Sequence, residues 1–157
     1  MKNIYTLLFL LFIGFGFAQM PNIETVWYND GKPYFGEIDT NKQLKLKINL
    51  SEQNKKNDQQ YFLSGYTLVN DTNYTKFEGD ITITKYKSGA KRNSIYGEYE
   101  LAEEPGNKHT GVFTGKFIYT FKWNKKTEKI ESQFIQFLGD WKSYDGTLNY
   151  KTSWKNN

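Results

Sequence analysis

"FTGKFIYTFKW", residues 113–123, decides the fold because its large apolar residues occupy every second position except one, which holds a glycine. The residues on this face are Phe113, Gly115, Phe117, Tyr119, Phe121 and Trp123. "LKLKINL" (44–50) and "TLNYKTSW" (147–154) alternate in the same way. Two-residue alternation is typical of a half-buried strand, and helical periodicity is nearly absent from the chain. The sequence therefore predicts an all-β protein.

Clusters of Gly, Pro, Asn, Asp and Ser separate the alternating stretches and indicate turns. Reading strands between these turns predicts eight, at 33–38, 43–50, 60–69, 75–86, 94–101, 111–123, 130–141 and 147–154. Short connections favour antiparallel neighbours joined as hairpins. We therefore expect a single antiparallel up-and-down β-barrel, with a two-sheet β-sandwich as the alternative.

A five-residue motif recurs within these strands: a large apolar residue, any residue, Gly, a charged residue and a second large apolar residue. It occurs at "YFGEI" (34–38), "FEGDI" (77–81), "IYGEY" (95–99), "FTGKF" (113–117) and "FLGDW" (137–141). Period two places each glycine on the apolar face and the charged neighbour on the opposite face. We expect the glycines to face the barrel interior, where they let strands bend and make room for rings on adjacent strands.

The N-terminus has the features of a secretory signal peptide. Lys2 precedes an apolar run from Ile4 to Phe17, and small residues stand at Gly16 and Ala18. We expect cleavage after Ala18, so that residues 1–18 are a leader and 19–157 a single domain in the periplasm or outside the cell. An uncleaved anchor is the alternative. The mature chain is not expected to span a membrane, because charged residues such as Lys45, Glu98 and Asp140 lie on the predicted outer face.

Composition argues against several classes of function. The chain has no Cys, which excludes disulfides and thiolate chemistry. Without Lys2 it carries 20 Lys and Arg against 17 Asp and Glu, interspersed along the sequence, so no nucleic-acid partner is expected. The single histidine, His109, lies in a polar loop with no metal-ligand spacing around it. Four glutamates, Glu98, Glu100, Glu103 and Glu104, are assigned to the outer face or a loop. We expect no catalytic residues, metal or cofactor.

Aromatic residues make up 18% of the chain and supply the candidate site. Tyr and Trp combine a large apolar ring with a polar atom that requires a partner, so some of those on the inner face should lie at a barrel mouth. Trp123, Trp141 and Trp154 stand at predicted strand ends. The candidate ligand-binding residues are Asn29, Tyr34, Tyr99, Tyr119, Trp123, Trp141, Tyr150 and Trp154.

Four stretches resemble the avidin family of eight-stranded barrels: "VWYNDG" (26–31), "FKWNKK" (121–126), "FLGDW" (137–141) and "LNYKTSW" (148–154). The resemblance implies a barrel with a ligand at one mouth, Asn29 at a polar contact, and Trp123 and Trp154 at ring contacts. Lipocalin-type barrels are an equally open comparison.

The functional expectation is an exported binding module for a small amphiphile or carbohydrate at the barrel mouth. The alternative is an envelope-associated structural or protein-interaction domain without a small-molecule ligand. The corresponding partners are a small molecule or glycan in the first case and an envelope protein in the second.

Overall fold

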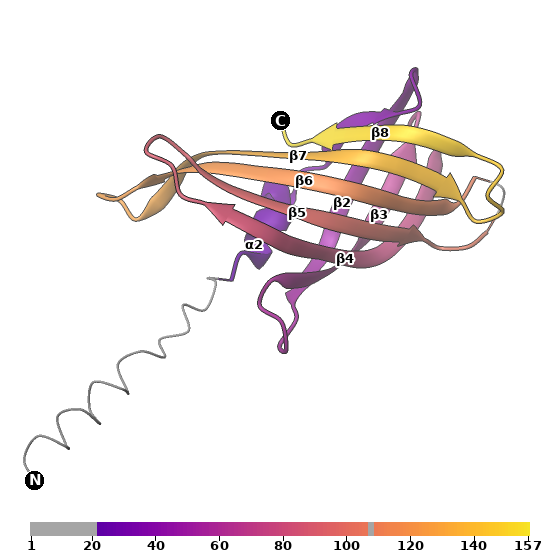
Figure 1. Cartoon of the computed structure of the whole chain (residues 1–157). Helices are drawn as coiled ribbons and strands as arrows, with labels where there is room; N and C mark the ends of the chain where they lie inside the picture. Colours follow the sequence, from indigo (N-terminus) through magenta and orange to yellow (C-terminus); the bar gives the residue numbers. More distant parts are fainter. Residues whose placement is uncertain (1–21, 107–108) are drawn as a thin grey trace, which may run out of the picture.

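A computed structural model describes residues 22–106 and 109–157, and its eight strands form one closed barrel in sequence order (Figure 1). Every strand is antiparallel to its neighbours, and the barrel closes where β1 pairs with β8. The strands are β1 (Tyr34–Ile38), β2 (Lys42–Gln53), β3 (Gln60–Val69), β4 (Asn73–Lys87), β5 (Asn93–Glu103), β6 (Gly111–Asn124), β7 (Lys129–Ser143) and β8 (Asn149–Lys155). The predicted up-and-down barrel is confirmed. The predicted leader, residues 1–18, lies outside the described residues.

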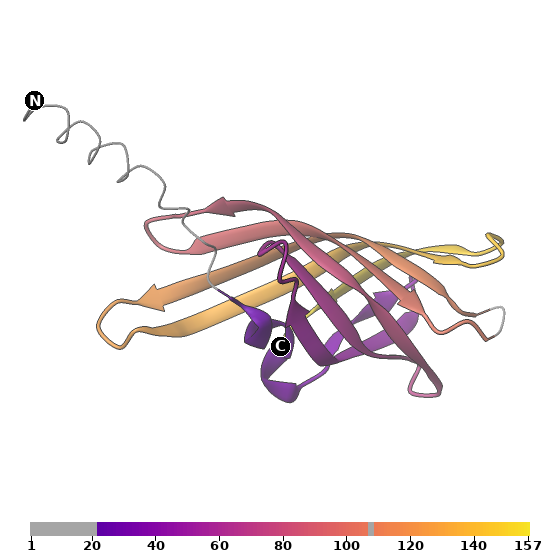
Figure 2. The same cartoon turned by 90° about the horizontal axis from the view of Figure 1, so that it is seen from below.

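The barrel has two unlike ends. The hairpins β1–β2, β3–β4, β5–β6 and β7–β8 turn at one end, which we call the mouth. At the other end, the short helix α2 (Glu24–Trp27) and the 3₁₀ turn η1 (Asn29–Gly31) cross the opening and plug it (Figure 2). No helix among the described residues has the length and apolar character needed to cross a bilayer.

Trp27 anchors the plug and is fully buried. Its ring makes edge contacts with Tyr61 and Phe117, at centroid distances of 5.8 and 5.2 Å. Its backbone oxygen accepts a hydrogen bond from the Tyr34 hydroxyl at 2.9 Å. Glu24 of the same helix accepts a hydrogen bond from the backbone N–H of Gln53, at the end of β2. These contacts hold α2 across the barrel end, and sequence periodicity did not predict so short a helix.

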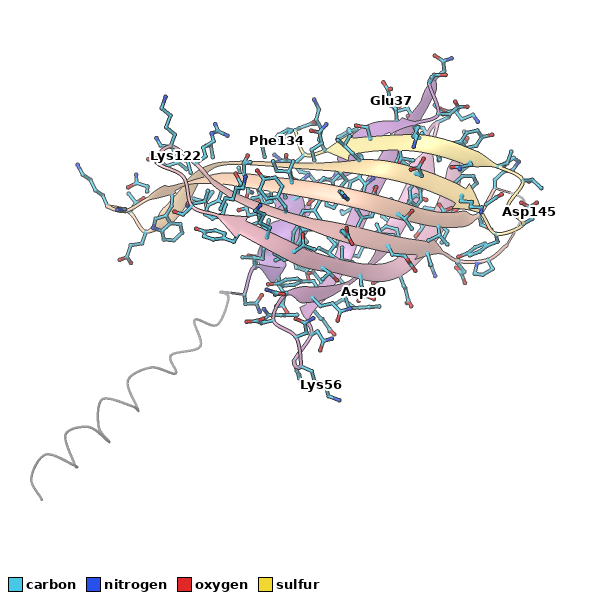
Figure 3. The ribbon with its side chains drawn as sticks, in the orientation of Figure 1. Glu37, Lys56, Asp80, Lys122, Phe134 and Asp145 are labelled. Atoms are coloured by element: carbon cyan, nitrogen blue, oxygen red, sulfur yellow. The ribbon has the colours of Figure 1, made fainter. Side chains whose placement is uncertain are left out.

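The five motif glycines face the interior, as predicted. Direct partners in an antiparallel pair share a face, and Gly36 pairs with buried Trp154 while Gly97 pairs with buried Phe117. A Cβ atom on Gly36 would lie 2.6 Å from Trp154 Cβ, and one on Gly97 would lie 2.6 Å from Phe117 Cζ. The charged motif neighbours point away from the barrel, as Glu37 and Asp80 do in Figure 3.

Aromatic rings fill the middle of the barrel. Phe137 and Trp154 stack at a centroid distance of 3.5 Å with their planes 10° apart. Tyr34 and Tyr99 make edge contacts with both of these rings, at 5.4–5.6 Å. The space left by the glycines is therefore occupied by rings at this level.

Replacing Gly97 by Ala should destabilise the barrel, because the new methyl group would overlap both the Phe117 ring and the backbone of Thr82. Overpacking of this kind costs about 1–3 kcal/mol, which urea unfolding would measure. Gly106→Ala is the matched control, since the nearest atom to its Cβ would be 4.0 Å away. Equal stability of the two variants would contradict the close packing at Gly97.

Candidate functional site

The mouth end contains a recess of about 160 Å³. Apolar side chains from five strands line it, together with polar groups from the rim; the residues include Ile38, Lys42, Val69, Asn73, Glu103, His109, Phe113, Trp141 and Tyr150. Trp141 and Tyr150 are cross-strand partners on β7 and β8, and their rings stack at 5.7 Å with planes 10° apart. Trp141 is buried, whereas Tyr150 is half-buried and carries the Lys42 ammonium 4.5 Å above its ring.

Glu103 lies buried at the base of this recess, so its assignment to an exposed loop was wrong. β5 continues two residues beyond its predicted end, and Glu103 follows Tyr99 and Leu101 on the inner face. Its carboxylate accepts hydrogen bonds from Thr67 Oγ1 at 2.6 Å, Trp141 Nε1 at 2.9 Å and the backbone N–H of Gly111 at 3.1 Å. These bonds join β3, β5, β6 and β7.

Burial raises the pKa of Glu103 above its ordinary value, while its three donors act in the opposite direction. The donors satisfy the carboxylate, so its main physical effect is to fix the Trp141 ring. Outside the barrel wall, the Tyr144 hydroxyl donates a hydrogen bond to the backbone oxygen of Glu103. The backbone N–H of Tyr144 donates to the backbone oxygen of Thr110 at 3.2 Å. The loops after β5 and β7 are thereby connected at the rim.

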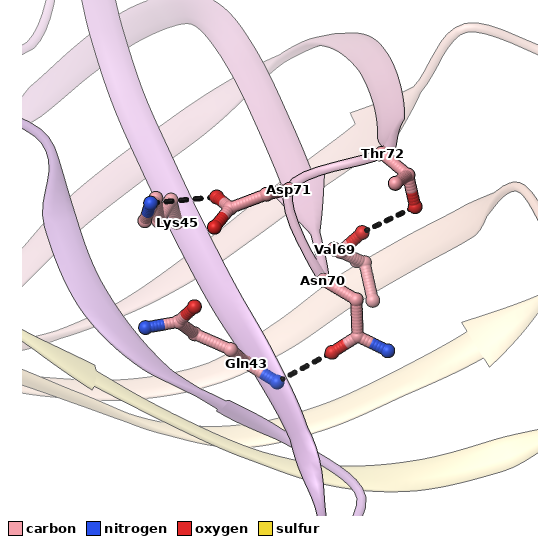
Figure 4. A network of polar contacts seen from close by, with 6 residues as sticks. All are labelled: Gln43, Lys45, Val69, Asn70, Asp71 and Thr72. Carbon is pink, nitrogen blue, oxygen red and sulfur yellow. Dashed lines mark hydrogen bonds and ion pairs between the residues drawn. The ribbon is translucent and has the colours of Figure 1, made fainter.

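A second polar network holds the opposite side of the rim (Figure 4). Asn70 and Asp71 adopt left-handed conformations, with φ of 52° and 58°, which Asn and Asp tolerate better than most residues. The Asn70 side chain accepts a hydrogen bond from the Gln43 N–H at 3.0 Å, and Asp71 pairs with Lys45 at 2.6 Å. These contacts bind the β3–β4 hairpin to β2, so the recess has fixed walls on both sides.

Three buried polar atoms lie deeper on the inner face, at the level of the central rings: Tyr99 Oη, Thr152 Oγ1 and Trp154 Nε1. None makes a hydrogen bond of normal geometry within the described part of the chain. Thr152 lies two residues along β8 from Tyr150, and its cross-strand partner is Gly139, which has no side chain. Burial raises the pKa of Tyr99 to about 12, and its neighbours Thr152 and Trp154 act in the opposite direction.

The structure distributes seven of the eight predicted site residues over three levels of the barrel. Only Trp141 and Tyr150 meet at the mouth. The central level holds Tyr34, Tyr99 and Trp154, so the placement of Trp154 near a mouth was wrong. Asn29 and Tyr119 lie at the plugged end, where the Asn29 amide donates to Lys32 O and Pro33 O at 3.3 and 3.2 Å.

Trp123 is 46% exposed and lies outside the barrel interior, contrary to the prediction from alternation. It stands where β6 runs beyond the barrel end, next to an irregularity in the β6–β7 register between Lys122 and Trp123. Alternation correctly places inner-face residues only along the part of a strand that the barrel encloses.

No protein-family model, curated protein or solved structure matches the chain. The closed eight-stranded barrel is compatible with the resemblance to avidin-type and lipocalin-type barrels, and these comparisons assign the chain to no family. Within residues 22–106 and 109–157, no cluster of three or more His, Asp or Glu side chains is arranged to hold a metal ion.

Replacing Glu103 by Leu should cost about 2–5 kcal/mol, because two buried donors, Trp141 Nε1–H and Gly111 N–H, would each lose a partner. Glu103→Gln should cost much less, since the amide oxygen replaces the acceptor for both donors and the amide nitrogen can donate to Thr67 Oγ1. Chemical unfolding of both variants would measure the difference.

The pH dependence of the same variants separates the charge of Glu103 from its shape. Because the folded-state pKa is raised, the folded protein binds this proton more readily than the unfolded chain does. The free energy of unfolding contributed by Glu103 therefore falls as pH rises from the ordinary pKa of 4.5 to the raised value. Wild type should lose stability relative to Glu103→Gln across that interval, and a constant difference would contradict this prediction.

Two tyrosine hydroxyls in the centre should respond oppositely to removal. Tyr34→Phe deletes a hydrogen bond to Trp27 O and should cost about 0.5–1.5 kcal/mol. Tyr99→Phe deletes a buried hydroxyl without a normal hydrogen bond and should be neutral or stabilising. Thermal unfolding would rank the two variants, and a larger loss for Tyr99→Phe would show that its hydroxyl is satisfied in solution.

Proposed function

We propose that the protein is an exported binding module that takes a small carbohydrate or amphiphile at the barrel mouth. The observation that carries the proposal is the mouth recess, in which a stacked Trp141–Tyr150 pair is fixed from below by buried Glu103. Burying the Glu103 carboxylate costs free energy, and the carboxylate orients the Trp141 ring. This arrangement is consistent with a preorganised ligand contact.

The size of the recess limits the ligand. Pockets for drug-sized molecules have volumes of about 300–1,000 Å³, so a recess of about 160 Å³ holds only a single ring or the end of a longer molecule. Tyr150 would offer an apolar ring face to a ligand once the Lys42 side chain, whose ammonium lies 4.5 Å above the ring, moves aside, and Lys42 and Asn73 offer hydrogen bonds at the rim. A sugar ring combines an apolar C–H face with peripheral hydroxyls and therefore suits this arrangement.

Ligand binding should shift the indole N–H resonance of Trp141 in two-dimensional NMR spectra, assigned by its loss in Trp141→Phe. The probes are monosaccharides and short-chain amphiphiles, with affinities expected near the millimolar range for so few contact atoms. Tyr150→Ala should weaken binding about tenfold by removing the stacking ring.

Tyr74→Ala is the matched control, since Tyr74 is an exposed tyrosine on β4 whose ring contacts that of Tyr66 at a centroid distance of 5.0 Å. Absence of any Trp141 shift across the set of probes at high concentration would contradict the proposed function. So would equal loss of binding in the Tyr150 and Tyr74 variants.

A domain for envelope association is the second candidate. It is favoured by exposed apolar side chains at the plugged end, at Tyr86, Trp123 and Ile130.

A further inference from the structure

Four strands run beyond the barrel at the plugged end. The pairing of β3 with β4 ends at Gln60 and Thr82. On the other side, β8 has ended by the point where Asn156 N–H donates to the backbone oxygen of Ile135 in β7. The β4–β5 and β6–β7 hairpins continue past these points as one sheet, because β5 and β6 stay paired as far as Asn93 and Phe121. Both views show the two hairpins projecting together from the same end (Figures 1 and 2). We call residues 84–95 and 120–132 the overhang.

Positive charge concentrates on the overhang. It holds eight of the 21 Lys and Arg residues in the chain but only two of the 17 Asp and Glu residues. One of these two carboxylates, Glu131, is already paired with Lys122 at 2.6 Å. Figure 3 shows Lys122 at this end and Asp145 at the opposite end of the molecule. The cationic residues are Lys85, Lys87, Lys91, Arg92, Lys122, Lys125, Lys126 and Lys129.

Exposed apolar side chains lie on the same hairpins as these cations, with Tyr86 on the opposite face of β4 from its neighbours Lys85 and Lys87. Tyr86 near one hairpin tip is 51% exposed, and Trp123 and Ile130 near the other are 46% and 39% exposed. Trp123 and Ile130 are direct cross-strand partners, so the two side chains share one face of the hairpin. Large apolar residues grouped on the surface of a monomer often mark an interaction site.

We propose that the overhang docks the protein on the surface of an anionic lipid bilayer. Trp and Tyr prefer the membrane–water interface, where an apolar ring is buried and its polar atom stays hydrated. Lysines near the surface are attracted by anionic headgroups, and stable peripheral binding requires an apolar signal and an electrostatic signal together. The overhang supplies both within two adjacent hairpins.

A membrane surface explains the composition better than an anionic polymer does. Lysines and aromatic rings also suit a polyanion such as a nucleic acid, but Ile130 has no π-face on which a base could stack. Insertion into an interface uses Tyr86, Trp123 and Ile130 alike. In the docked orientation the mouth, at the other end of the barrel, points away from the bilayer and stays open to solution.

The docking surface can be tested by co-sedimentation with vesicles of phosphatidylglycerol and phosphatidylcholine. The protein used is the chain from Gln19 onward, without the expected leader. Binding should require phosphatidylglycerol and fall with added salt. Trp27, Trp141 and Trp154 are at most 3% exposed, so quenching by brominated lipid should report Trp123 almost alone.

Two matched variants localise the binding, each replacing four cationic residues by Gln. One changes the hairpin tips, at Lys91, Arg92, Lys125 and Lys126. The other changes exposed lysines elsewhere, at Lys76, Lys116, Lys142 and Lys155. The tip variant should bind at least about tenfold more weakly than wild type, and the other variant should stay within about threefold.

Ile130→Ser separates the membrane from a polymer. It should weaken vesicle binding several-fold and leave binding to a soluble polyanion, heparin or single-stranded DNA, unchanged. Equal effects of the two quadruple variants, or vesicle binding without quenching by brominated lipid, would overturn the proposal. Tight polyanion binding with no vesicle binding would overturn it in favour of a polymer ligand.

Discussion

Close approach of backbones at inward glycines is the constraint on which the barrel depends. A barrel of eight strands has an interior just wide enough to be filled by side chains, so glycines on neighbouring strands make room for several of its large rings. Gly36 faces Trp154, Gly97 faces Phe117, and Gly139 leaves room for the Tyr99 hydroxyl, which would lie 2.8 Å from a Cβ there. These pairings allow Phe137 and Trp154 to stack in the centre, and the plug and mouth are built on either side of that stack.

The sequence predicted the strands and their inward faces because both follow from local alternation and turn composition. Each of the eight strands was found within a few residues of its predicted range. What escaped prediction is short or depends on where the barrel ends. The four-residue helix α2 is too brief for a periodic signal, and its stability comes from Trp27 packing on Tyr61 and Phe117.

The candidate site was only partly predictable, for two physical reasons. Glu103 continues the inner-face alternation of Tyr99 and Leu101, a signal that was present but was overruled by the turn-like residues that follow it. The charge on the overhang has no such signal in the sequence. Residues 85–92 and 122–129 are dispersed along a chain of near-balanced charge, and only the pairing of β5 with β6 brings them together.

The β1–β8 seam has a consequence for how the chain folds. Seven of the eight strand contacts join neighbours along the chain, so they form at small loop-closure cost. The eighth joins residues 35–38 to 152–155 through only four residue pairs. It is the contact of greatest sequence separation, so an open, curled meander should precede it on the folding pathway. The aromatic centre of the barrel is then shielded from water only after β1 has paired with β8.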